Sequence, residues 1–282
     1  MRDNPLYTRR KMSRAWRYAL LALLVLVSVG GGGWVANNLI FGGRAQAVPG
    51  TPHTLRVQLG VSERDVALVT EGLRLADGAF RELLGAHVAE PVTVRLARRT
   101  PCIAFARRTT GTAHADADEI CVDTTKPTWR YAVREEPTLA LSIVAHEHLH
   151  NLQGQLGCLP GPDEHTHLWL VEGTATYMGW QTVRRAGLVT DAGITREMRA
   201  WGGFRPDLKP LSSYERILGG DPEYALAHRA VRRLVVHTGT PASLVAFCQQ
   251  VGAGRAWKTA LHSSFGTSVE AFYAAFEASR RR

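Results

Sequence analysis

A short apolar run, residues 142–152, carries the pattern His-Glu-x-x-His. Its apolar residues predict an α-helix. At an advance of about 100° per residue, His146 and His150 lie about 40° apart on one helix face, one turn from each other. Two imidazoles in this arrangement can bind one cation, and Glu147 can reach a metal-bound water rather than the metal. His148 lies about 200° from His146 and points away from this face.

A metal site with an open catalytic position needs a third protein ligand. The next apolar segment, 168–177, contains one carboxylate, Glu172, which follows the second histidine by 22 residues. A lone carboxylate among buried residues is costly unless it is paired or binds a metal. Gly173 beside it would let the two helices approach closely. The connection between the helices is rich in glycine and proline and holds the alternative third ligands, His165 and His167.

The two motifs together resemble the gluzincin family of zinc metallopeptidases, which combines His-Glu-x-x-His with a later Trp-Leu-x-Glu-Gly-x-Ala. The resemblance is specific over about residues 139–180. It implies a hydrolase that cleaves peptide or protein substrates with one Zn²⁺ per chain. It also implies Glu147 as the general base and three zinc ligands, His146, His150 and Glu172.

Two features depart from the family patterns. The thermolysin branch has an aspartate four residues beyond the ligand glutamate, where this chain has Thr176. The Gly-x-Met-Glu-Asn motif of the aminopeptidase branch, which holds a substrate's free amine, is absent from the sequence. We therefore do not predict exopeptidase action. Family members stabilise the oxyanion with a tyrosine or histidine from a later helix, and the two candidates here are Tyr224 and His228, one turn apart.

Short alternating segments before the active helix predict a small β-sheet. Residues 53–59, 91–96 and 119–123 read as strands, and the small polar residues of 109–118 read as a loop. In gluzincins an edge strand just before the active helix pairs with the extended substrate, and the segment 119–124 occupies that place in order. An internal strand paired on both sides is the alternative.

Helical periodicity accounts for most of the remaining chain. The predicted fold class is α+β, with a transmembrane helix followed by a mainly helical gluzincin-like domain that has a small mixed sheet before the active helix. The aromatic residues and prolines of 187–220 suggest a packed loop over the site, and ordinary surface packing is the preferred alternative. Helices are predicted over 62–84, from Pro137 to before Gly154 or Gly157, from Asp221 to Gly239, and near 241–251 and 267–280.

The N-terminal region has the composition of a membrane anchor. Residues 18–41 contain no charged side chain and are long enough to cross a bilayer, and they follow a basic segment, 1–17. This pattern predicts a single-pass protein of the cell membrane, with a cytoplasmic N-terminus, a linker over 42–53 and an extracytoplasmic domain over 54–282. A cleaved signal peptide, with a site near Ala45-Gln46-Ala47, and secretion are the alternative.

The four cysteines, Cys102, Cys121, Cys158 and Cys248, all follow this apolar segment. An even count in an oxidising compartment favours disulfides. We predict the pairs Cys102–Cys121 and Cys158–Cys248. Zinc binding by these cysteines is not expected, because no two of them have the close Cys-x-x-Cys spacing.

The net charge of +9 at pH 7 does not indicate a nucleic-acid partner. Seven basic residues and one acidic residue precede position 48, which leaves the remaining 235 residues with a net charge of only +3. No basic stripe with interleaved aromatic residues is present in the sequence. Besides the hydrolase, two other functions are compatible with the motifs: an inactive zinc-binding domain that recognises peptide or cell-envelope material, and a membrane-tethered scaffold whose metal is incidental.

Overall fold

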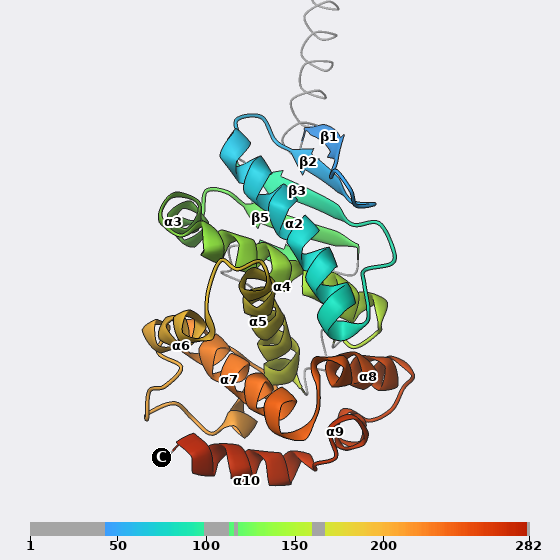
Figure 1. The fold of residues 1–282 in the computed structure, drawn as a ribbon, viewed down its shortest axis with the longest axis vertical. Helices are drawn as coiled ribbons and strands as arrows, with labels where there is room; N and C mark the ends of the chain where they lie inside the picture. The colour runs from blue at the N-terminus through green and yellow to red at the C-terminus, as the bar shows by residue number, and fades with distance from the viewer. Residues whose placement is uncertain (1–42, 99–112, 116–117, 160–166, 281–282) are drawn as a thin grey trace, which may run out of the picture.

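A computed structural model describes residues 43–98, 113–115, 118–159 and 167–280 (Figure 1). The described part is mainly helical, with a small mixed sheet near its N-terminal end. This arrangement confirms the mainly helical α+β part of the predicted fold class. The sheet precedes the His-Glu-x-x-His helix in the chain, as expected.

The strands form one sheet in the order β1-β2-β3-β5-β4. The central pairs, β2 with β3 and β3 with β5, are parallel, and the outer pairs are antiparallel. Val94, Leu96, Ile120 and Val122 alternate along β3 and β5 and are buried in the main core. The strands are β1 (Arg44–Ala47), β2 (Thr54–Val57), β3 (Thr93–Ala97), β4 (Ala113–Ala115) and β5 (Glu119–Asp123).

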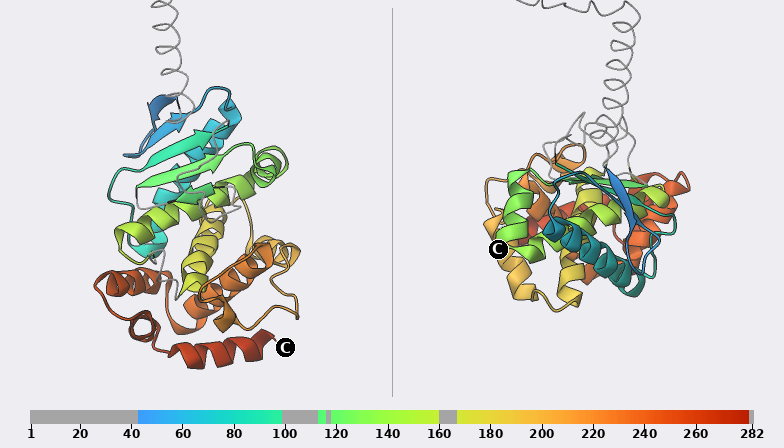
Figure 2. Two further views of the ribbon diagram at one scale, coloured as in Figure 1. Left: turned by 180° about the vertical axis from the view of Figure 1, so that it is seen from behind. Right: turned by 90° about the horizontal axis from the view of Figure 1, so that it is seen from above.

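Helix α2 (Glu63–Leu84) covers one face of this sheet (Figures 1 and 2). It begins at Ser62, which forms a capping box with Asp65, and it ends at Gly85 in the left-handed conformation. Its apolar face, which includes Leu73 and Phe80, packs into the core. The helix predicted over 62–84 is confirmed.

Helices α4 (Pro137–Gln155), α5 (Leu168–Arg185) and α7 (Asp221–Thr238) carry the residues of interest. Helix α4 packs against α2 and α5, and α5 packs against both α4 and α7. Helices α4 and α7 have proline in the first turn, which suits a helix start. The remaining helical elements are α3 (Pro127–Glu135), α6 (Asp191–Ala200), the 3₁₀ turn η1 (Leu211–Tyr214), α8 (Pro241–Gly252), α9 (Trp257–Phe265) and α10 (Val269–Arg280).

A disulfide joins Cys158, just after α4, to Cys248 on α8. This confirms one predicted pair. Cys121 is buried on β5, and its predicted partner, Cys102, lies outside the described residues.

The membrane part of the prediction is corrected. Among the residues that the structure describes, no helix combines the length and the apolar character needed to cross a bilayer. The apolar helix α4, for example, contains three histidines and a glutamate. The predicted fold class is corrected accordingly, and the cell-membrane localisation that was based on a spanning helix is not retained. The segments 1–17 and 18–41 lie outside the described residues.

Several local expectations also differ from the structure. Residues 44–47 form β1, within the segment read as a linker, and residues 113–115 form β4, within the segment read as a loop. Strand β5 is therefore not an edge strand, because it pairs with β3 on one side and β4 on the other. Helix α6 and the turn η1 occupy part of 187–220, which was read as a loop.

Candidate metal centre

The His-Glu-x-x-His segment lies in the second half of α4, where it faces the first half of α5. His146, His150 and Glu172 come together, and each offers a ligand atom. Glu172 Oε2 lies 3.3 Å from His146 Nε2 and 3.3 Å from His150 Nε2. The two Nε2 atoms are 3.1 Å apart. The structure thus brings together the three side chains that the sequence motifs indicated as ligands.

This triangle of donor atoms has the dimensions of one face of a tetrahedral metal site. A tetrahedral ion bonded to nitrogen and oxygen ligands at about 2.0–2.1 Å separates those ligands by about 3.3–3.4 Å. The observed separations of 3.1–3.3 Å are close to this value. One ion can therefore touch all three atoms without any movement of the helices.

Gln153 fixes the orientation and the tautomer of the His150 ring. Its amide nitrogen donates to the carbonyl of Val171 at 3.1 Å, so its Oε1 atom faces His150 Nδ1 at 2.7 Å. Because an amide oxygen only accepts hydrogen bonds, His150 Nδ1 must carry the proton. The Nε2 atom of a neutral His150 then presents a lone pair to the centre of the triangle.

Thr176 has the corresponding relationship to His146. Its hydroxyl donates to the carbonyl of Glu172 at 2.9 Å and faces His146 Nδ1 at 3.4 Å. The hydroxyl hydrogen is used in the first bond, so the oxygen accepts from His146 Nδ1. The Thr176 hydroxyl is thus a neutral acceptor that can orient the His146 ring.

These bonds leave two imidazole lone pairs and one carboxylate oxygen facing a single point. Without a positive charge at that point, the three acceptors would repel one another. A metal cation resolves this conflict, and the ring orientation by Gln153 and Thr176 is the kind of outer support that metal-binding histidines usually have. The residues present therefore fit a metal ion.

The electrostatics of the metal-free site also favour a cation. Burial alone would lower the pKa of His150, but the carboxylate of Glu172 outweighs this effect and raises it to about 9. The two imidazoles hold the pKa of Glu172 well below its usual value despite its burial. The site is thus built around a carboxylate that stays ionised.

Two further polar side chains lie close to the triangle. Glu147 is 7 % exposed and close enough for its charge to act on both His150 and Tyr224. The Tyr224 ring, on the first turn of α7, lies 6.2 Å from the His146 ring. The charge of Glu172 and burial raise the pKa of Tyr224 well above its ordinary value. Its hydroxyl therefore stays protonated and can donate a hydrogen bond.

His228, the other oxyanion candidate, is enclosed between helices. It is 1 % exposed, and its ring lies 5.8 Å from that of Tyr177. Among the described residues, neither of its ring nitrogens has a hydrogen-bond partner. Burial and the charges of Arg232 and Arg229 lower its pKa to about 3, so His228 is neutral.

His167, one of the two alternative third ligands, is not part of this cluster. His167 is buried at the start of α5, where its Nε2 donates to the carbonyl of Cys158 at 3.2 Å and its ring stacks on Trp257. His165 lies outside the described residues. Glu172 is therefore the third member of the cluster in the described part of the chain.

Two glycines let α5 reach its neighbours closely. A Cβ atom on Gly179 would lie 2.6 Å from the carbonyl oxygen of Ser142 on α4. A Cβ atom on Gly173 would lie 2.7 Å from the carbonyl oxygen of Ala227 on α7. Backbone contact on both sides holds Glu172 between the histidines of α4 and the tyrosine of α7.

A second buried cluster, not foreseen from the sequence, lies behind α4. His148, Asp77 and His53 also form a group that could hold a metal ion. His148 Nε2 lies 2.9 Å from Asp77 Oδ1, and His53 Nε2 lies 3.4 Å from Asp77 Oδ2. The Nδ1 atom of His53, however, accepts the amide hydrogen of Val92 at 3.2 Å, which places the ring proton on Nε2.

The contacts within this cluster are those of a buried imidazole–carboxylate group. His53 Nε2 faces Asp77 Oδ2 at 3.4 Å, outside hydrogen-bond geometry, whereas His148 Nε2 faces Asp77 Oδ1 at 2.9 Å. Interactions with His148 and His53 lower the pKa of Asp77, although burial opposes them. The cluster ties α4 to α2 and to the segment before β2. As expected, His148 points away from the face that carries His146.

Comparisons with known proteins add no assignment. No family model matches the sequence, and no curated protein matches it either.

Proposed function

We propose that this chain is a zinc-dependent metallopeptidase. The observation that carries the proposal is the convergence of two imidazole Nε2 atoms and one carboxylate oxygen, 3.1–3.3 Å apart, beside a buried glutamate. Two histidines and one glutamate, with an open fourth position, form a ligand set typical of catalytic zinc. The proposed ligands are His146, His150 and Glu172.

Zinc, when bound, lowers the pKa of a water ligand and polarises the scissile carbonyl. The protein supplies the proton transfers. Glu147 follows a ligand directly in the sequence, and it is the proposed general base, which accepts a proton from the attacking water and then delivers it to the departing amine nitrogen. Its buried position keeps the proton away from bulk solvent.

Tyr224 is the proposed donor to the developing oxyanion. Its ring lies beside that of His146, and the raised pKa keeps the hydroxyl protonated. A donor placed where negative charge develops stabilises the transition state more than the ground state. His228 is buried, and none of the described interactions joins it to the three proposed ligands. These two observations favour Tyr224 over His228 in this role.

The substrate is proposed to bind as an added strand. Within the described residues, β1 and β4 are the two outer strands of the sheet, and β4 is the one that packs near α4. An extended peptide can pair with such an edge through its backbone, with its scissile bond toward α4. The proposed partner strand is thus β4 rather than β5.

The test uses metal analysis together with digestion of a peptide library. The wild-type chain should contain about one zinc ion and cleave peptides, whereas Glu147→Gln should keep the zinc and lose several orders of magnitude in kcat/KM. Glu172→Ala should lose the metal. Equal cleavage by Glu147→Gln and the wild type would reject Glu147 as the base. If the wild type binds zinc but cleaves no peptide, the chain is an inactive zinc-binding domain.

A further inference from the structure

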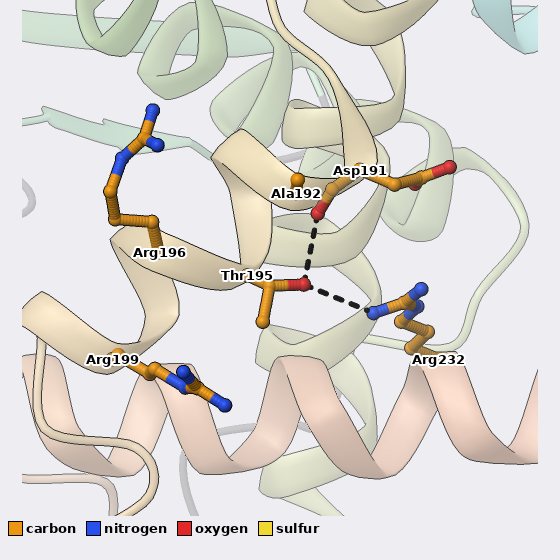
Figure 3. Close-up of a pocket in the computed structure, with 6 residues that line it drawn as sticks. All are labelled: Asp191, Ala192, Thr195, Arg196, Arg199 and Arg232. Atoms are coloured by element: carbon orange, nitrogen blue, oxygen red, sulfur yellow. Dashed lines mark hydrogen bonds between the residues drawn. The ribbon is translucent and has the colours of Figure 1, made fainter.

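A surface pocket between α6 and α7 is lined by arginines (Figure 3). Its volume is about 520 Å³, which is within the range of small-molecule sites. Arg199 and Arg232 extend toward the middle of the view from opposite sides of Thr195, and Arg196 extends away. The complete lining is Asp191, Ala192, Thr195, Arg196, Arg199 and Arg232.

The pocket arginines carry positive charges that no ion pair neutralises within the described residues, although the charge of Glu197 is coupled to that of Arg196. Within the described part of the chain, Arg196, Arg199 and Arg232 form no ion pair. The one acidic residue of the lining, Asp191, faces Arg184 at 3.4 Å, and its carboxylate extends away from Thr195 in Figure 3. An anion in the pocket would therefore meet guanidinium groups without competition.

Two contacts hold the guanidinium groups in place. The hydroxyl of Thr195 donates to the carbonyl of Asp191 at 2.9 Å, so its oxygen is free to accept from Arg232 Nη1 at 3.5 Å. Arg199 lies over the Phe204 ring, 5.1 Å from its centroid. Arg229, which lies on the same ring at 3.7 Å, adds another positive charge. Burial and the charges of Arg280 and Arg199 lower the pKa of Arg229 to about 10.

We propose that this pocket binds a phosphoryl group, held by Arg199 and Arg232. A guanidinium offers paired N–H donors that match phosphate oxygens, and a dianion balances more of this charge than a carboxylate does. Arg232 follows Tyr224 by two helical turns, about 12 Å along α7, so the site is separate from the metal centre. The proposal does not depend on the proposed hydrolase activity.

The test titrates the full-length chain with inorganic phosphate, with O-phosphoserine and with succinate, by calorimetry at constant ionic strength. We expect saturable binding of inorganic phosphate or of O-phosphoserine. Succinate should bind at least about tenfold more weakly. Tighter binding of phosphoserine than of inorganic phosphate would identify a phosphate ester as the ligand, and the reverse order would identify free phosphate. Both orders support the site.

The variants decide whether the arginines are responsible. Arg199→Gln with Arg232→Gln should weaken phosphate binding by about tenfold or more, and Arg199→Lys, which keeps the charge but loses the paired donors, should weaken it severalfold. The control, Arg130→Gln with Arg216→Gln, removes the same charge from exposed arginines elsewhere and should bind like the wild type. The proposal would be overturned if the Arg199 and Arg232 double variant bound phosphate as tightly as the wild type does. It would also be overturned if the wild type bound succinate as tightly as phosphate, or if it showed no saturable binding of phosphate or of O-phosphoserine.

Discussion

Gln153 holds His150 by a 2.7 Å contact between its amide oxygen and Nδ1 of the ring. The amide cannot rotate freely, because its nitrogen donates to Val171 on the neighbouring helix α5. A residue outside the proposed ligand set thus sets which nitrogen of a proposed ligand faces the metal. This role does not require any contact with a substrate.

Gln153→Leu should therefore weaken metal binding by about 10- to 100-fold, since the ring of His150 loses its fixed orientation. Gln153→Glu keeps an acceptor for the Nδ1 proton and should stay within a few-fold of wild type. Competition with a coloured chelator measures the affinity. The matched control is Gln155→Leu, because Gln155 bonds to the backbone of Ala89 and Glu90 instead. Wild-type affinity in Gln153→Leu would show that the contact has no orienting role.

Gly179→Ala should lower the free energy of unfolding by about 1–3 kcal/mol, because the new Cβ would overlap the backbone of α4. The comparison is Gly78→Ala in the middle of α2, where the nearest atom to a new Cβ is the flexible Arg185 side chain at 3.6 Å. That substitution should raise stability by about 0.5–1 kcal/mol through helix propensity. Denaturant unfolding measures both. Similar effects of the two substitutions would argue against close packing at Gly179.

Replacing both Cys158 and Cys248 by serine should lower the free energy of unfolding by about 2–5 kcal/mol, because the disulfide closes a long loop of the unfolded chain. Thermal unfolding of the variant, and of the wild type with and without reductant, checks this expectation. Reductant should shift the Tm of the wild type toward that of the variant. An unchanged midpoint in the variant would contradict it.

The buried His228 should make the fold sensitive to acid. Its pKa is lowered to about 3 in the folded protein, whereas an ordinary histidine in the unfolded chain has a pKa of about 6.5. Between these values only the unfolded chain takes up this proton, so stability is full above pH 6.5 and falls as the pH decreases. The slope from this group is at most about 1.4 kcal/mol per pH unit.

His228→Phe removes this titration and keeps a ring against Tyr177. The free energy of unfolding of the variant, measured at pH 7, 6 and 5, should fall less steeply than that of the wild type. His167, whose pKa burial also lowers, is present in both proteins and does not affect the difference. Parallel curves would mean that the pKa of His228 is the same in the folded and unfolded states.

The sequence predicted those features that depend on local patterns. Helix α2 was predicted over 62–84 from its periodicity, and helix α7 was predicted from Asp221 to Gly239. The grouping of Glu172 with the two histidines was predicted from motif spacing. In each case the residues that determine the feature are close together in the chain or belong to a specific motif.

Features that depend on distant contacts were not predicted. The role of Gln153 depends on a carbonyl of α5, and the role of Thr176 depends on a ring of α4. The cluster of His53 with Asp77 requires that α2 cross the sheet beside α4. Strand β4 lies within the small and polar segment 109–118, which has no strand periodicity, and it is a strand because β5 pairs with it.

The disulfide also determines how the chain would respond to a protease. Glu172 and Tyr224 lie between Cys158 and Cys248, whereas His146 and His150 precede the first cysteine. A single cut between α6 and α7 would therefore produce two fragments that remain covalently joined, with the glutamate still attached to the histidine-bearing piece. Such nicked protein would migrate as one band on a gel until the sample is reduced.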